Sequence, residues 1–155
     1  MFRSKQFIAC LCLIAALVFA IGVADEVCLR ASDGGRVTLI KGLIGLQQTQ
    51  NTGAAFGIFS GHKGLAALVS GAALAAMLAF MLLGRMSLPA RLGLAAALTG
   101  GAYNLVERFS AGGVTDYFEL EFMRFPLFNC ADVCVCAGLM LFAVCYLLEG
   151  RGQRE

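Results

Sequence analysis

The hydrophobic positions of the chain fall into four long runs that are separated by polar segments. Because a helix rises about 1.5 Å per residue and the hydrocarbon core of a bilayer is about 30 Å thick, roughly 20 apolar residues are enough to cross it. The runs at 7–24 and 64–83 carry no charge, whereas those at 92–111 and 129–148 reach this length only by including ionisable residues. The pattern predicts four transmembrane helices.

The polar segment 25–63 is too long for a simple turn and too rich in glycine for one continuous helix. Within it, 36–46 mixes Val, Thr, Leu and Ile with two glycines, which is typical of short, bent strands. The Asn-Thr-Gly sequence at 51–53 predicts a turn. No repeat or linker divides the chain, so we expect one all-α integral membrane domain over 1–155, with short strands outside the membrane.

The composition agrees with a membrane protein and excludes an ordinary soluble domain. Of the 155 residues, 59% are hydrophobic and only 14% are charged, whereas a soluble domain carries about 25% charged residues. Covering a core with so few charges would leave a large apolar surface in water. The formal net charge of +2 is too small to indicate a nucleic-acid-binding surface.

The basic residues indicate which ends of the helices face the cytoplasm, because short cytoplasmic segments carry an excess of lysine and arginine. Such residues are dense in the terminal segments and in 84–91, and sparser in 25–63 and 112–128. We therefore expect both termini in the cytoplasm and the ionisable ends of the third and fourth runs outside. The residues on the cytoplasmic side are Arg3, Lys5, Arg85, Arg91, Arg151 and Arg154.

The first hydrophobic run also has features of a secretory signal peptide. Arg3 and Lys5 precede it, and it ends in the small-residue sequence Gly-Val-Ala at 22–24. Its length exceeds the 7–15 residues that are usual for the apolar part of a signal peptide. This favours a retained membrane anchor, with a cleaved signal peptide as the alternative.

Polar side chains at membrane depth are costly and are therefore candidates for function. Gly100, Asn104 and Arg108 recur every four residues and share one face of the third run, where the glycine allows close helix approach. Asn129 and Asp132 share a face of the fourth run. We expect these groups to meet at the outer end of the bundle. The alternative is a polar cluster that only holds the helices together.

Two carboxylates, Asp116 and Asp132, belong to the outer interface. Carboxylates brought within a few Å cannot both ionise easily, so that one can act as a base on water while the other acts as an acid toward a peptide carbonyl. The pair therefore fits an aspartic protease. The alternative is that each carboxylate is solvated or paired with Arg108 or Arg124.

The cysteines and the single histidine give little support for a redox or metal-binding function. Most of the seven cysteines lie within the hydrophobic runs, where cysteine serves as a small apolar residue. A thiol–disulfide oxidoreductase would need an exposed outer pair, and the sequence contains no C-x-x-C motif. His62 stands alone and fits a solvated loop better than a metal site. The cysteines are Cys10, Cys12, Cys28, Cys130, Cys134, Cys136 and Cys145.

Taken together, three blocks of sequence resemble the lipoprotein signal peptidases (signal peptidase II), bacterial membrane aspartic peptidases with four transmembrane helices. The first block is NTGAAFG at 51–57. The second is NLVER at 104–108, which leads to GVTDYF at 113–118, and the third is FNCAD at 128–132. The order, spacing and helix pattern agree as well, so the resemblance covers nearly the whole chain.

The resemblance implies an aspartic endopeptidase that cleaves diacylglyceryl-modified prolipoproteins just before the lipidated cysteine. Asp116 and Asp132 match the two catalytic aspartates of the family, which activate water. Other positions match residues that line the site, support the aspartates or engage the substrate, and these are Asn51, Gly53, Asn104, Arg108, Asn129 and Ala131.

The resemblance also implies the surroundings of the site. We expect a monomer in the bacterial inner membrane, with the active site at the outer face, and with prolipoprotein and membrane lipid as partners. No nucleic acid, metal or organic cofactor is expected. The segment 25–63 would form a small sheet that cradles the substrate, and the stretch after Asp116 would form a short outer helix.

The sequence departs from the family pattern at several positions. Glu107 replaces a usual aspartate, Tyr103 replaces a usual glycine, and Leu29 stands where lysine is common, with Arg30 adjacent. None of these changes touches the two aspartates. A non-catalytic small membrane protein and a membrane thiol–disulfide oxidoreductase are the alternative functions.

Overall fold

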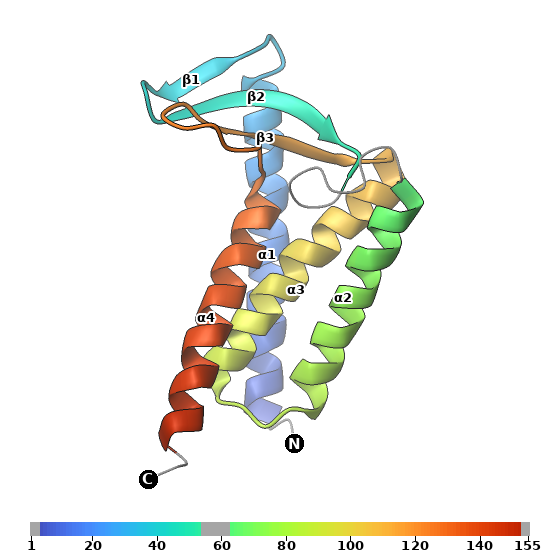
Figure 1. Ribbon diagram of the computed structural model, residues 1–155, viewed down its shortest axis with the longest axis vertical. Helices are drawn as coiled ribbons and strands as arrows, with labels where there is room; N and C mark the ends of the chain where they lie inside the picture. Colours follow the sequence, from blue (N-terminus) through green and yellow to red (C-terminus); the bar gives the residue numbers. More distant parts are fainter. Residues whose placement is uncertain (1–3, 54–62, 153–155) are drawn as a thin grey trace.

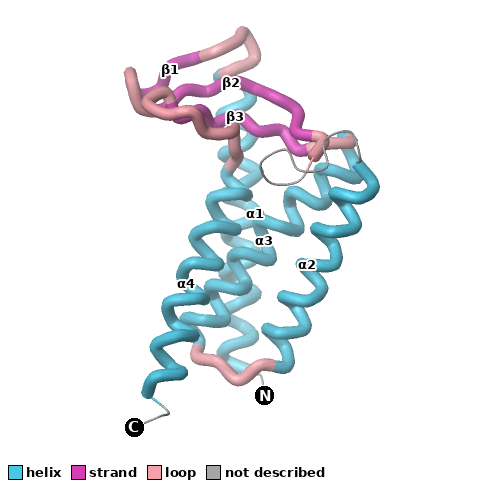
Figure 2. The backbone as a smooth tube through the Cα atoms, viewed as in Figure 1, coloured by secondary structure: helices cyan, strands magenta, loops and turns pink. Residues whose placement is uncertain are grey.

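The structure is a bundle of four long helices with a three-stranded sheet across one end (Figure 1). This computed structural model describes residues 4–53 and 63–152. Figure 2 shows the strands and longer loops gathered at the sheet end, whereas a short loop joins α2 to α3 at the opposite end. The elements are α1 (Ser4–Ala31), β1 (Val37–Ile40), β2 (Ile44–Asn51), α2 (Lys63–Leu83), α3 (Leu88–Ala111), β3 (Val114–Leu120) and α4 (Cys130–Gly152).

Within residues 4–53 and 63–152, three helices are long and apolar enough to cross a membrane. They are α1, the part of α2 from Gly64 to Leu83, and the part of α4 from Cys130 to Glu149. The fourth long helix, α3, covers the predicted run 92–111 and is less apolar. The described chain therefore has helices at all four predicted runs, and three of them have the composition of a membrane span.

The position of α3 explains its polar content. It packs against α1, α2 and α4, and its buried residues include Arg91, Thr99 and Asn104. Because the other helices cover it, α3 can carry polar side chains that a lipid-facing helix would expose to hydrocarbon.

The contact between α3 and α4 depends on glycines. A Cβ atom at Gly100 would lie 2.2 Å from the carbonyl oxygen of Ala131, and one at Gly138 would lie 2.5 Å from the backbone nitrogen of Ala97. Small residues allow helix backbones to approach this closely. The predicted role of Gly100 in close helix approach is therefore confirmed.

Arg91 stabilises the end of the bundle that lies opposite the sheet. The sequence placed it among the cytoplasmic basic residues, but its side chain is only 1% exposed. Its guanidinium donates to the carbonyl oxygens of Met81 and Gly84, with a distance of 2.9 Å to Gly84. Carbonyls at the end of a helix lack partners within that helix, so Arg91 satisfies the end of α2.

The sheet is antiparallel, with β2 between β1 and β3. Leu46 pairs with Phe118 and Thr49 pairs with Asp116, so two residues of β2 face Tyr117 alone. This bulge lies beside the predicted catalytic Asp116. Bulges bend a strand and are frequent next to active sites, where they re-aim side chains.

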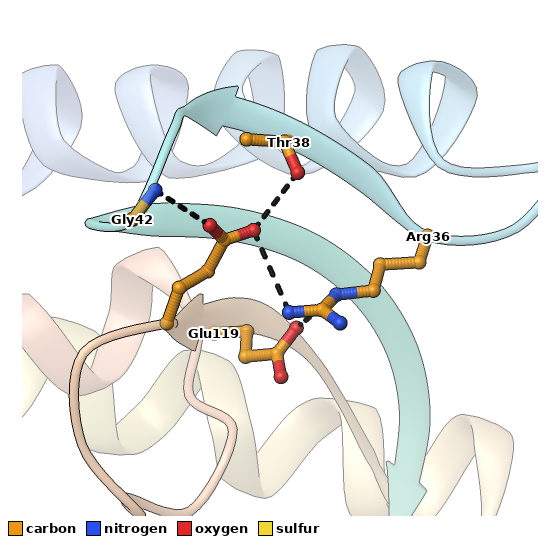
Figure 3. A network of polar contacts seen from close by, with 5 residues as sticks. Arg36, Thr38, Gly42 and Glu119 are labelled. Carbon is orange, nitrogen blue, oxygen red and sulfur yellow. Dashed lines mark hydrogen bonds and ion pairs between the residues drawn. The ribbon is translucent and has the colours of Figure 1, made fainter.

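A polar network fastens the β1–β2 hairpin to the end of β3, and Figure 3 shows Arg36, Thr38, Gly42 and Glu119 within it. The carboxylate of Glu121 accepts from the Thr38 hydroxyl at 2.9 Å and from the Gly42 N–H at 2.8 Å. Arg36 forms ion pairs with Glu119 at 2.8 Å and with Glu121 at 3.5 Å. The two hydrogen bonds lower the pKa of Glu121.

The sequence predicted the sheet in outline but missed its third strand. The predicted strands at 36–46 correspond to β1 and the start of β2, and α1 extends past the predicted end at residue 24. The short helix expected after Asp116 is wrong, because 112–129 contain no helix and 114–120 form β3. The β-branched and aromatic residues of β3 favour a strand. Residues 54–57 of the first family block and His62 lie outside the described residues.

Replacing Glu121 with Gln tests the network. The substitution Glu121→Gln removes the carboxylate that accepts from Thr38 and Gly42, so we expect faster trypsin cleavage after the exposed Lys41 at neutral pH. In the unaltered protein the lowered pKa means that this stabilisation is complete near neutral pH. It is lost as the pH falls through that pKa, below the usual glutamate value of about 4.3. Equal cleavage of both proteins at Lys41 would contradict the network.

Candidate active site

The two aspartates reach the junction of sheet and bundle from different elements. Asp116 lies on β3 and is 3% exposed, and Asp132 lies half-buried in the first turn of α4. Each of their four carboxylate oxygens accepts a hydrogen bond, from the side chain or backbone of an asparagine. The structure therefore brings together the two carboxylates that the sequence singled out.

Asn129 connects the two aspartates. Its side-chain amide donates to Asp116 at 3.2 Å, and its backbone N–H donates to Asp132 at 3.2 Å. Its side-chain oxygen accepts from the N–H of Asp132 at 2.9 Å. The reciprocal bonds between Asn129 and Asp132 form a capping box, in which the residue before the helix and the third helical residue cap one another. The cap fixes the position of Asp132 on α4.

Asn104 brings α3 into the site. Its amide donates to Asp132 at 2.7 Å, and its side-chain oxygen accepts from the amide of Asn129 at 3.1 Å. Asn104 and Asn129 are both buried. The prediction that the polar faces of the third and fourth runs meet is therefore confirmed in the structure.

Asn51, Gly53 and Arg108 form the side of the site nearest the end of β2. The Asn51 amide donates to Asp116 at 3.1 Å, and the Asn51 side-chain oxygen accepts from the N–H of Gly53 at 3.0 Å. This second bond confirms the predicted turn at 51–53. Arg108 donates to the carbonyl oxygen of Gly53 at 2.8 Å. Among the described residues, no ion pair joins either aspartate to Arg108 or Arg124.

The surroundings of Asp116 favour its protonated form. Burial raises the pKa of Asp116 to about 6, and the negative charges of Asp132 and Glu107 act in the same direction. The hydrogen bond from Asn51 and the charge of Arg108 oppose this rise. Asp132 instead lies at the N-terminus of α4, where the helix dipole favours a negative charge. The two carboxyls therefore lie in different surroundings, one buried on a strand and the other half-buried at the N-terminus of a helix.

Two of the remaining sequence features have structural roles. Ala131 is buried, and its carbonyl faces Gly100, so its backbone belongs to the contact between α3 and α4. Glu107 accepts from the backbone N–H of Thr115 at 3.0 Å and holds the start of β3. Its position one residue before Arg108 in the family block was the available signal for this role.

Sequence reasoning missed a second set of contacts behind the aspartates. The hydroxyl of Tyr117 donates to Asp25 on α1 at 2.6 Å and accepts from the backbone N–H of Cys130 at 3.1 Å. The sequence signals were the charge of Asp25 near the end of an apolar run and its match to an acidic position of the family that the chain resembles. In the described part of the chain, no cluster of three or more His, Cys, Asp or Glu side chains is arranged to hold a metal ion.

Comparisons with known proteins agree on one family. A sequence profile of the family described as signal peptidase (SPase) II matches residues 7–148. The chain is similar to a lipoprotein signal peptidase of Lactobacillus gasseri, with 30% identity over 147 residues that cover 94% of this chain and 95% of that protein. It is also similar to one from Clostridium acetobutylicum, with 33% identity over 117 residues that cover 73% of this chain and 76% of that protein.

A solved structure shares the fold. It is described as a bacterial membrane enzyme and superposes with a TM-score of 0.82 at 22% sequence identity, covering 95% of this chain and 92% of its own. A second structure with the same description, a bacterial membrane enzyme, gives a TM-score of 0.76 over 90% of this chain and 92% of its own.

Substitutions at Asn129 separate its capping role from its contact with Asp116. Asn129→Ala removes the cap, which lowers the free energy of unfolding by about 1 kcal/mol. It also leaves the buried oxygens of Asp116 and Asn104 without a donor, which lowers it by about 1–3 kcal/mol more. Asn129→Ser keeps a capping oxygen, so we expect it to unfold at a temperature between those of Asn129→Ala and the unaltered protein.

Thermal unfolding of the purified protein in detergent measures both variants. Ser87→Ala, which removes only the N-cap of α3, is the matched control, and it should destabilise the protein less than Asn129→Ala does. Equal unfolding temperatures for Asn129→Ala and Ser87→Ala would contradict the additional role of Asn129.

Proposed function

The chain belongs to the signal peptidase II family, and from this premise we propose that Asp116 and Asp132 are its catalytic pair. Family membership makes the chain a protease that cleaves the signal peptides of prolipoproteins. The observation that supports the catalytic pair is the shared contact with Asn129, which holds a buried and a half-buried carboxyl beside one another. Membership of a protease family argues against the two alternative functions, a non-catalytic membrane protein and a thiol–disulfide oxidoreductase.

The proposed reaction uses one water molecule and the two carboxyls in opposite roles. Asp132 takes a proton from the water, whose oxygen attacks the carbonyl carbon of the scissile peptide bond. Asp116 donates its proton to the carbonyl oxygen, and a tetrahedral diol forms. When the carbon–nitrogen bond breaks, the leaving nitrogen takes the proton from Asp132, and Asp116 recovers its proton from a hydroxyl of the diol.

The pKa of Asp116 supports this assignment of roles. An acid must carry a proton when the substrate binds, and burial raises the pKa of Asp116 to about 6. Asp132 has the position of the base, because the N-terminus of α4 stabilises its charged form. Asn51, Asn104 and Asn129 hold the carboxyls with neutral donors, which favour the charged form less strongly than a cation would.

The substrate is proposed to be a diacylglyceryl-modified prolipoprotein that is cleaved just before its lipidated cysteine. The diacylglyceryl chains can stay in the outer leaflet while the peptide reaches the aspartates at the sheet end of the bundle. Each buried CH₂ group contributes about 0.8 kcal/mol to membrane binding, so the lipid holds the substrate at the correct depth. Gly53 and Arg108 lie at the edge of the site, where they are placed to engage the peptide.

The proposed topology has four membrane spans, with α3 as the fourth. Its burial against α1, α2 and α4 supports this, because a covered helix can cross the membrane with polar side chains. The basic residues of the termini and of 84–91 favour a cytoplasmic location for both ends of the chain. The active site then faces the outer side of the bacterial inner membrane, in a monomer built as one domain over 1–155.

Removing either carboxylate tests the catalytic pair. We expect Asp116→Asn and Asp132→Asn each to lower the cleavage rate by about 10²-fold or more, the usual contribution of a general acid or base. Accumulation of uncleaved prolipoprotein in membranes is the measurement. Asp33→Asn, at an exposed aspartate in the turn after α1, is the matched control and should cleave normally. Normal processing by either active-site variant would refute the pair.

The pH dependence tests which carboxyl holds the proton. The pKa of Asp116 is raised to about 6, so its acid function is present below this pH and is lost as the pH rises through it. Protonation of the base removes activity at low pH, which makes the profile of kcat/KM bell-shaped. We expect the alkaline limb to begin at about pH 6. A value of kcat/KM that stays constant from acidic to alkaline pH would contradict the assignment.

A further inference from the structure

We propose that Asp25 is a positioning residue that fixes the first turn of α4, and with it Asp132, through the hydroxyl of Tyr117. The proposal rests on the proposed function, because it assumes that Asp132 is the base. It assigns a role to a carboxylate on α1, whereas the proposed catalytic pair lies on β3 and α4.

The contacts form a continuous path from α1 to α4. The hydroxyl of Tyr117 donates to Oδ1 of Asp25 at 2.6 Å, and the same hydroxyl oxygen accepts from the backbone N–H of Cys130 at 3.1 Å. Cys130 is the first residue of α4. Tyr117 is 1% exposed, so water does not readily replace either bond.

The receiving end of the path is the start of a helix, where backbone N–H groups lack partners within the helix. Asn129 accepts from the N–H of Asp132, and Tyr117 accepts from the N–H of Cys130. The first turn of α4 is therefore held at two points, one by the adjacent residue and one by β3. These two hydrogen bonds together fix the orientation of the turn that carries Asp132.

Asp25 makes Tyr117 an acceptor. A tyrosine hydroxyl has one proton, and donating it to the carboxylate leaves the lone pairs of the oxygen directed toward Cys130. A hydroxyl that donates to a charged group is also a stronger acceptor. Burial, and then the hydrogen bond to Asp25, raise the pKa of Tyr117, so the hydroxyl keeps the proton that this arrangement requires.

Tyr103 is a second partner of Asp25, on α3 rather than on the path to α4. It lies on α3, and its side chain also interacts with Asp25. Its hydroxyl lies against α1, since a Cβ atom at Gly22 would be 3.9 Å from it. Both tyrosines hold the same carboxylate, but only Tyr117 passes the contact to the first turn of α4. Tyr103 is therefore a matched control for Tyr117.

Loss of the path is expected to act on the chemical step. Small displacements of a catalytic group reduce rates strongly, by up to about 10²-fold for 1 Å. Substrate binding uses the rest of the site and the lipid. We therefore expect Tyr117→Phe and Asp25→Ala to lower kcat by about tenfold or more, with KM changed less than about threefold.

The test uses the full-length protein in detergent with a diacylglyceryl-modified prolipoprotein as substrate, and kcat and KM are measured separately. Asp25→Asn should recover most of the activity lost in Asp25→Ala, because its amide oxygen still accepts from Tyr117. Tyr103→Phe should keep kcat within about threefold of the unaltered protein. Asp25→Ala should have little further effect in the Tyr117→Phe protein, because both substitutions break one path.

Several results would overturn the proposal. Equal losses of kcat in Tyr103→Phe and Tyr117→Phe would show that the tyrosines act only by packing, as would fully additive effects of Asp25→Ala and Tyr117→Phe. If Tyr117→Phe does not fold, the comparison of Asp25→Ala with Asp25→Asn decides, and equal activity of these two variants refutes the path.

The proposed function fails by a different result. Normal cleavage by Asp132→Asn refutes the catalytic pair whatever the Asp25 variants do. An inactive Asp132→Asn together with normal kcat in Asp25→Ala and Tyr117→Phe refutes the positioning role alone.

Discussion

The need to satisfy buried carboxylates governs the structure around the site. Among the described residues, each oxygen of Asp116 and Asp132 accepts a hydrogen bond from Asn51, Asn104 or Asn129. An arginine in their place would stabilise both carboxylates in the charged form. Neutral amides satisfy the oxygens and favour the charged form less strongly than an arginine would, which is compatible with the proposed proton on Asp116. This requirement explains why the site draws on β2, β3, α3 and α4 at once.

The packing of the bundle serves the same requirement. Asn104 reaches Asp132 because α3 and α4 lie close together, and Gly100 permits this approach by leaving room for the carbonyl of Ala131. The bond network also needs a helix that carries amides inside the bundle, which is possible because the other helices cover α3. The polar character of α3 is therefore a condition for the site.

Much of this architecture could be predicted from sequence, because hydrophobic runs and four-residue spacing are local signals. They placed the helices, the shared face of Asn104 and Arg108, and the partner face of Asn129 and Asp132. The contact of Arg108 with the Gly53 carbonyl could not be predicted, since it joins residues far apart in the sequence. The strand at Asp116 was missed because its pairing with β2 depends on the register of a bulged sheet. The path through Tyr117 likewise exists only in the folded chain.

The capping box links the proposed catalytic role of Asp132 to its place at the start of α4. In the proposed reaction, Asp132 becomes neutral when it takes a proton from water. It then loses its favourable interaction with the helix terminus and accepts more weakly from the Asn129 N–H. In the proposed reaction, both losses favour the return of the proton from Asp132 to the leaving nitrogen. If Asp132 is the base, the start of α4 therefore helps to return it to its charged form after each round of cleavage.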